Sequence, residues 1–167
     1  MSLNKKFDFI IVGQGLAGTL LAHDLIDANK SVMIIDFNLK ASASRVAAGL
    51  INPISMKRCI PAIPSFYLPK CFERYRDLEK KLDSSFLNLT PLLRLFDSTD
   101  TNDKWKDKYI SGGMDIYIKE FIIDNSFSFL DDSSSSAIIE PAGHLDVINF
   151  LDLSRIYFSK KHFLLEE

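Results

Sequence analysis

Three glycines, Gly13, Gly15 and Gly18, are the feature that most restricts how this chain can fold. They follow an apolar, β-branched run at residues 7–12, which predicts a strand. From Leu16 to about Asn29, apolar residues recur every three or four positions, which predicts a helix. Glycine allows a tight turn and a close approach of the helix to the strand. The pattern therefore predicts a strand, a tight turn and a helix packed on that strand.

A second strand is predicted at residues 31–36, where Val32 to Ile35 are apolar without alternation. Such a run is typical of a strand buried on both faces of a parallel sheet, and the intervening helix makes a right-handed βαβ unit. The fold class that follows is α/β, with a Rossmann-like, three-layer fold of the kind that binds FAD or NAD(P). Asp36 ends this strand, where a carboxylate accepts hydrogen bonds from a ribose diol.

The glycine turn and Asp36 together predict a dinucleotide site. The expected binding residues in the turn are Gly13, Gln14, Gly15, Leu16, Ala17 and Gly18. Their amide groups and the positive end of the helix would face the diphosphate. An acidic side chain at the second strand disfavours a 2′-phosphate, so NADP fits poorly. The turn alone does not separate nicotinamide from flavin dinucleotides.

The segment after Asp36 favours a flavin. A nicotinamide-dependent dehydrogenase would continue with another helix and strand, whereas residues 41–53, ASASRVAAGLINP, are small and irregular. Small residues permit close backbone approach, hydroxyl groups can contact phosphate, and the N–H groups of a short helix can face an electron-rich ring. An NAD-dependent dehydrogenase remains an alternative.

GQGLAG, Asp36 and ASRVAAGLINP together resemble the flavin-dependent D-amino-acid oxidase family, especially its glycine-oxidase-like and sarcosine-oxidase-like members. The resemblance implies FAD in extended form, with its diphosphate over the glycine turn and a ribose on Asp36, which stands where glutamate is commoner. It also implies cofactor contacts from Phe37, Ser44, Arg45, Ala47, Ala48, Gly49 and Leu50.

The middle of the chain has a different pattern. It predicts a helix at 64–82, short antiparallel strands at 91–96, 115–123 and 127–130, a second helix at 145–160 and a strand from His162. The resemblance continues through EPAGHLDV at 140–147 and covers nearly all of this chain but only the first half of the family. It implies an FAD-binding Rossmann-like part at 1–53 and 141–167. Residues 54–140 would be an inserted helix and strands of a partial substrate domain.

Charge and composition give no support for several classes of partner. Twenty basic and 22 acidic side chains leave a formal net charge of −2, which gives no support for a nucleic-acid or membrane partner. Apolar stretches are far shorter than the ~20 residues of a membrane-spanning helix, and no secretory pattern is visible, so we expect a cytoplasmic protein. Cys59 and Cys71 stand without clustered histidines, which predicts reduced thiols and no metal site.

No catalytic residue is predicted. His144 beside Asp146 is better interpreted as part of a helix cap than as a catalytic pair, and His23 as a surface or packing residue. Lys57 and Arg58 are interpreted as a solvated loop, with contact to a substrate carboxylate as the alternative.

The sequence therefore predicts an FAD-binding fragment of an oxidoreductase that oxidises a small amine or amino acid by hydride transfer to flavin. One alternative is a non-catalytic or truncated dinucleotide-binding module. Such a module would need the missing C-terminal half, a homo-oligomer or a domain swap to complete an exposed sheet edge.

Overall fold

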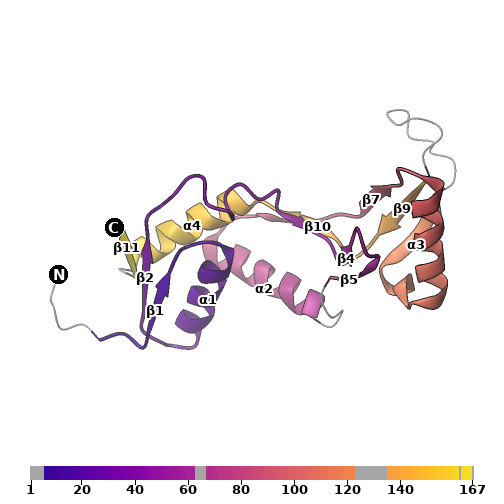
Figure 1. The fold of residues 1–167 in the computed structure, drawn as a ribbon. Coiled ribbons are helices and arrows are strands. Elements are labelled where there is room, and N and C mark those ends of the chain that lie inside the picture. Colours follow the sequence, from indigo (N-terminus) through magenta and orange to yellow (C-terminus); the bar gives the residue numbers. More distant parts are fainter. Residues whose placement is uncertain (1–5, 63–66, 123–134, 162, 167) are drawn as a thin grey trace. The chain divides into compact units, whose positions relative to one another are not determined.

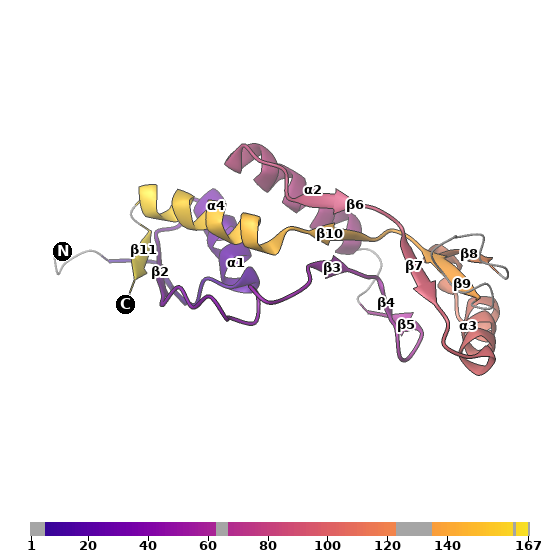
Figure 2. The ribbon, with the colours of Figure 1, turned by 90° about the horizontal axis from the view of Figure 1, so that it is seen from above.

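The computed structural model describes residues 6–62, 67–122, 135–161 and 163–166. These residues form two compact units, shown in Figures 1 and 2. Unit 1 comprises Met1–Gly49, Glu79–Phe86 and Asp146–Glu167, and unit 2 comprises Leu50–Leu78 and Leu87–Leu145. Within the described ranges, no helix is long and apolar enough to cross a membrane.

Unit 1 is built on a parallel sheet of three strands in the order β1–β2–β11. The strands are β1 (Phe9–Val12), β2 (Val32–Asp36) and β11 (Leu164–Glu166). Both predicted N-terminal strands are confirmed, and a strand near residue 162 begins at Leu164. Val32, Met33 and Ile34 are all buried, which confirms the expected burial of the second strand on both faces.

Two helices of unit 1 pack against this sheet and against each other, α1 (Leu16–Asp27) and α4 (Val147–Lys160). Their shared core with the strands contains Ile11, Ala22, Val32, Ile34 and Phe158. His23 of α1 is fully buried, and its Nε2 lies 3.0 Å from Ser154 Oγ of α4. Of the two roles expected for His23, at the surface or in packing, the structure supports the packing role.

Asp146 forms the N-cap of α4. Its carboxylate accepts a hydrogen bond from the Asn149 amide at 3.0 Å, which satisfies one of the free donors of the first turn. The neighbouring His144 is exposed on a short strand. The interpretation of Asp146 as a helix-capping acid is confirmed.

Unit 2 contains an antiparallel sheet in the order β7–β9–β8, covered by helix α3 (Thr99–Ser111) (Figures 1 and 2). The strands are β7 (Leu92–Leu95), β8 (Ile118–Ile122) and β9 (Ser136–Ile139), and a 3-10 turn, η1 (Met114–Ile116), precedes β8. The antiparallel assignment is confirmed for β7 and β8. The strand predicted at 127–130 lies outside the described residues. Trp105 anchors α3 in the core and is 2% exposed.

The remaining strands are very short. One antiparallel sheet has the order β3–β10–β6, with β3 (Leu50–Ile51), β6 (Leu87–Leu89) and β10 (Gly143–Leu145), and β4 (Ile54–Ser55) pairs with β5 (Ile60–Pro61). Sequence reasoning missed them, and treated residues 41–53 as irregular throughout, because two or three residues are too few to show an alternating pattern. Helix α2 (Tyr67–Leu82) ends where predicted.

Candidate functional site

The turn between β1 and α1 is shaped by Gly13. Its φ of +96° lies in the region that side chains disfavour, and an added Cβ would meet nothing within 4 Å. The Gly13 amide still donates to Ile35 O at 2.8 Å, so β1 stays paired with β2 up to the turn. The chain therefore leaves the sheet abruptly and enters α1 within three residues.

Gly18 is required by close packing inside the same turn. A Cβ at Gly18 would overlap the carbonyl oxygen of Gly13 and would lie 3.3 Å from Ile11 Cγ2. This confirms the expected role of the third glycine, which lets the first turn of α1 approach the strand.

The turn presents three unpaired backbone donors. The amide of Gln14 donates to Asp36 Oδ1 at 2.8 Å, and that of Leu16 donates to Ser44 Oγ at 3.0 Å. In the part of the chain that the structure describes, the amides of Gly15, Ala17 and Gly18 have no hydrogen-bond partner. Such donors at the N-terminus of a 12-residue helix favour an anion.

Asp36 is held by three donors at the end of β2. Besides Gln14, the Asn38 amide and Arg155 Nη1 each donate to Asp36 Oδ2 at 2.8 Å. Desolvation by burial is the largest single effect on the Asp36 pKa and raises it. The hydrogen bonds from Gln14, Arg155 and Asn38, with the positive charge of Arg155, outweigh it, so the pKa lies below the ordinary value of 3.8. The carboxylate is therefore ionised and fixed in orientation.

Arg155, on α4, was not predicted by sequence reasoning. It is 9% exposed, and its Nη1 also donates to Gln14 Oε1 at 2.8 Å. Gln14 Nε2 donates in turn to Leu151 O at 2.8 Å. The Gln14 side chain therefore ties the turn to α4. The expected contact of Gln14 with a cofactor stays a prediction. Sequence reasoning could have identified Arg155 as a charged residue on the apolar face of a predicted helix, because such a residue is seldom buried without a partner.

A hollow of about 240 Å³ lies between the turn and the end of β2. It is smaller than the ~300–1,000 Å³ of a pocket for a whole ligand, so it suits one portion of a larger ligand. Its lining residues are Val12, Gly13, Gln14, Gly15, Ile35, Asp36, Phe37, Leu39, Ser42 and Arg45.

The structure brings only part of the predicted set together. Gly13, Gln14, Gly15, Asp36, Phe37 and Arg45 line the hollow, and Ser44 contacts the helix terminus beside it. Ala47 and Ala48 are exposed, Gly49 is half-buried, and none of the three lines the hollow. Leu50 begins β3 in unit 2. The expected contacts of all the predicted residues with a cofactor, including these last four, stay predictions.

The chain has the α/β fold found in oxidoreductases of amino acids. It is similar to an L-amino acid deaminase from Proteus vulgaris (18% identity, TM-score 0.68, 99% of this chain and 41% of that one). It is also similar to a glycine oxidase from Bacillus cereus ATCC 14579, with 18% identity and a TM-score of 0.73 over 96% of this chain and 46% of that one. A third similar structure is an L-proline dehydrogenase from P. horikoshii, with 15% identity and a TM-score of 0.58 over 98% of this chain and 45% of that one. The chain spans less than half the length of these structures. No family model and no curated protein matches it.

Proposed function

We propose that this chain is an FAD-binding portion of an oxidoreductase that acts on a small amine or amino acid. The observation that carries the proposal is that three amides without a hydrogen-bond partner at the start of α1 and the ionised carboxylate of Asp36 occur in the same site. The fold similarity to oxidases, a deaminase and a dehydrogenase of amino acids supports the same class. In this proposal residues 1–53 and 141–167 bind the cofactor, and residues 54–140 belong to a partial substrate domain.

The residues present fit the diphosphate and ribose of FAD. The amides of Gly15, Ala17 and Gly18 would receive the diphosphate, and no Cβ stands in front of Gly13 or Gly15. The Ser44 hydroxyl accepts from Leu16, which leaves its own proton free to donate to phosphate.

Asp36 offers the ribose a limited contact. A carboxylate has about four lone-pair sites, and in Asp36 three of these sites already accept hydrogen bonds from Gln14, Asn38 and Arg155. One site therefore remains for a ribose hydroxyl. This carboxylate would orient the sugar as well as attract it.

Bound FAD would supply the acceptor for the two electrons and the hydrogen removed from the amine carbon. The residues of this chain would bind and orient that cofactor. Turnover is proposed only for the chain together with the remainder of the fold, because the chain spans less than half of its structural neighbours.

Gly15→Ala is expected to weaken FAD binding about tenfold or more while changing the thermal midpoint little. Gly15 has φ −79° and ψ −173°, which alanine adopts freely. The new methyl group would meet only the Ser44 side chain, with Oγ at 2.8 Å and Cβ at 3.7 Å. It would also stand where a diphosphate must approach the amides. Quenching of FAD fluorescence during titration with protein measures the affinity.

Leu21→Ala, on the half-exposed side of α1, is the control and should bind FAD like the wild type. Equal affinities for wild type and Gly15→Ala would contradict the site. Protection of the wild type against heat by NADH and not by FAD would replace the proposal with an NAD-dependent dehydrogenase.

A second candidate function is a module completed by a partner. β1 pairs only with β2 among the described strands, and its Ile10 and Val12 are 63% and 80% exposed. A free strand edge with apolar side chains favours pairing with another strand. We propose that a further segment of the fold, or a second copy of the chain, covers this edge.

Ile10→Lys is expected to shift a dimer of this chain to monomer, because a lysine disfavours apolar pairing along β1. Light scattering during size-exclusion chromatography measures the mass. The matched control is Ile110→Lys on α3, where the isoleucine is 81% exposed in unit 2. A wild-type chain that is monomeric and binds FAD would argue against the proposal that a second copy of the chain covers the edge of β1.

A further inference from the structure

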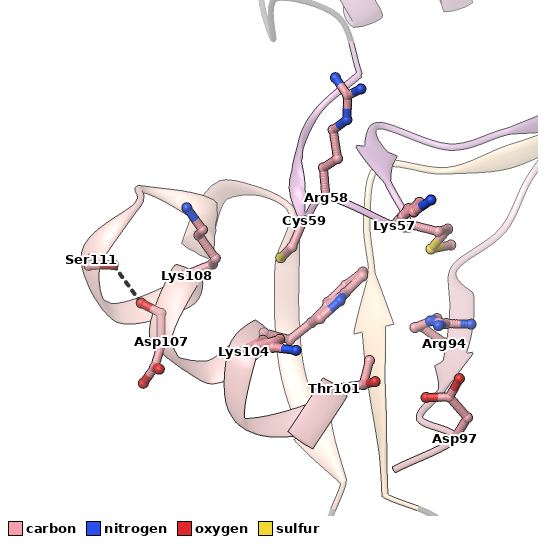
Figure 3. Close-up of a pocket in the computed structure, with 12 residues that line it drawn as sticks. Lys57, Arg58, Cys59, Arg94, Asp97, Thr101, Lys104, Asp107, Lys108 and Ser111 are labelled. Atoms are coloured by element: carbon pink, nitrogen blue, oxygen red, sulfur yellow. Dashed lines mark hydrogen bonds between the residues drawn. The ribbon is translucent and has the colours of Figure 1, made fainter. Parts of the chain in front are cut away.

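A second cavity, of about 620 Å³, lies within unit 2 and has no role in the proposed FAD site. Figure 3 shows that its lining side chains come from three segments. The loop between β4 and β5 contributes Lys57, Arg58 and Cys59, β7 contributes Arg94, and α3 contributes Lys104 and Lys108. Its volume falls in the ~300–1,000 Å³ range of small-molecule pockets.

The lining of this cavity is strongly basic. It carries five cationic side chains, Lys57, Arg58, Arg94, Lys104 and Lys108, against the two acids Asp97 and Asp107. The whole chain is nearly balanced, with 20 basic and 22 acidic residues. Positive charge is therefore concentrated at this cavity, where it attracts anions.

Few of these cations are neutralised by neighbours. Lys104 pairs with Asp100 at 2.5 Å, but both side chains are highly exposed, and such a pair contributes little. The pKa of Asp97 lies below its usual value. The largest cause is a hydrogen bond from the Thr101 side chain, and the positive charge of Arg94 is a lesser cause. Lys57, Arg58 and Lys108 form no ion pair with any described residue.

Arg94 is the residue that points most directly to a ligand. Its Nε is buried and has no hydrogen-bond partner among the described residues. A buried donor left without a partner is costly, and a guanidinium binds phosphate or carboxylate oxygens through paired N–H groups. In Figure 3 the Arg58 guanidinium extends away from α3, so Arg94 is the better anchor of the two.

We propose that this cavity binds a small organic anion bearing two or more oxyanion groups, with Arg94 as the anchoring donor and Lys104 and Lys108 as supporting charges. Trp105 and Met56 also line the cavity and provide an apolar surface for the rest of the ligand. Lys57 and Arg58, which the sequence placed in a solvated loop, also line this cavity. The proposal does not depend on FAD binding.

Trp105 makes the test local, because it is the single tryptophan of the chain and lines the cavity. The full chain would be titrated with pyrophosphate or with citrate at constant ionic strength while tryptophan emission is recorded. We expect a saturable change that weakens with added salt. Tighter binding of pyrophosphate would assign phosphate groups to the ligand, and tighter binding of citrate would assign carboxylates.

Arg94→Gln should raise the apparent dissociation constant of the anion about tenfold or more, because it removes the guanidinium and its two parallel N–H donors. Lys108→Gln, at an exposed position, gives a second variant that keeps the fold and should weaken binding several-fold. Lys106→Gln lies on the same helix outside the cavity lining and is the matched control. Emission unchanged by either anion, or identical titrations for all three variants, would overturn the proposal.

Discussion

Gly18→Ala is expected to lower the thermal midpoint of unit 1 by about 4–8 °C, which corresponds to about 2 kcal/mol for a chain of this size. The new methyl group would overlap the Gly13 carbonyl oxygen, a backbone atom that cannot move aside without opening the turn. Alanine gains ~0.5–1 kcal/mol in helix propensity, and the overlap exceeds that gain. Differential scanning calorimetry measures the midpoint.

Ala17→Ser is the control for Gly18→Ala, because it adds one heavy atom at the exposed neighbouring position of α1. Its midpoint should stay within about 2 °C of the wild type. An unchanged midpoint for Gly18→Ala would show that the first turn of α1 does not pack on Gly13 as described. The same variant should also lose FAD affinity if the proposed site is correct, because opening the turn displaces the amides that are proposed to bind the diphosphate.

Arg155→Met is expected to reduce the free energy of unfolding of unit 1 by about 2–3 kcal/mol near neutral pH. Removing one partner of a fully buried pair costs about 3–5 kcal/mol, and the figure is lower here because Asp36 is partly exposed. Methionine keeps much of the side-chain volume but leaves Asp36 Oδ2 and Gln14 Oε1 without the guanidinium. Urea unfolding followed by circular dichroism measures the loss.

The destabilisation by Arg155→Met should depend on pH in a defined direction. Asp36 has a lowered pKa in the folded protein, so its stabilising contribution is complete above the ordinary value of 3.8 and is lost as the pH falls through the folded pKa. The difference between wild type and variant should therefore be largest near neutrality and shrink below pH 3.8. A constant difference across this range would show that Arg155 acts through packing alone.

Arg45→Met is the matched control for the charge effect. Arg45 pairs with Asp152, whose side chain is 53% exposed, and solvent-exposed pairs contribute about 0–1 kcal/mol. Its effect on stability should be small, and it removes one cation from the lining of the hollow beside the glycine turn. A larger loss for Arg45→Met than for Arg155→Met would reverse the assignment of the buried network.

The local features of the candidate site were predictable from the amino-acid order. The turn at Gly13–Gly18, the strands on either side of α1 and the position of Asp36 all arise from residues close together in the chain. Apolar periodicity and glycines at specific positions are local signals, so they predict such elements without knowledge of distant contacts. Short strands such as β3 and β10 were missed because their pairing, and not their own sequence, makes them strands.

The partners of the site residues were decided by the tertiary structure. Arg155 lies 119 residues from Asp36, and Ser44 lies 28 residues from Leu16. The basic cavity around Arg94 likewise joins a loop, a strand and a helix. Periodicity tells which face of a helix is apolar, but the packing of that helix determines which charge it places beside a given carboxylate. The amino-acid order alone therefore determined the glycine turn and the position of Asp36, and only the folded chain determined that Asp36 is held by an arginine.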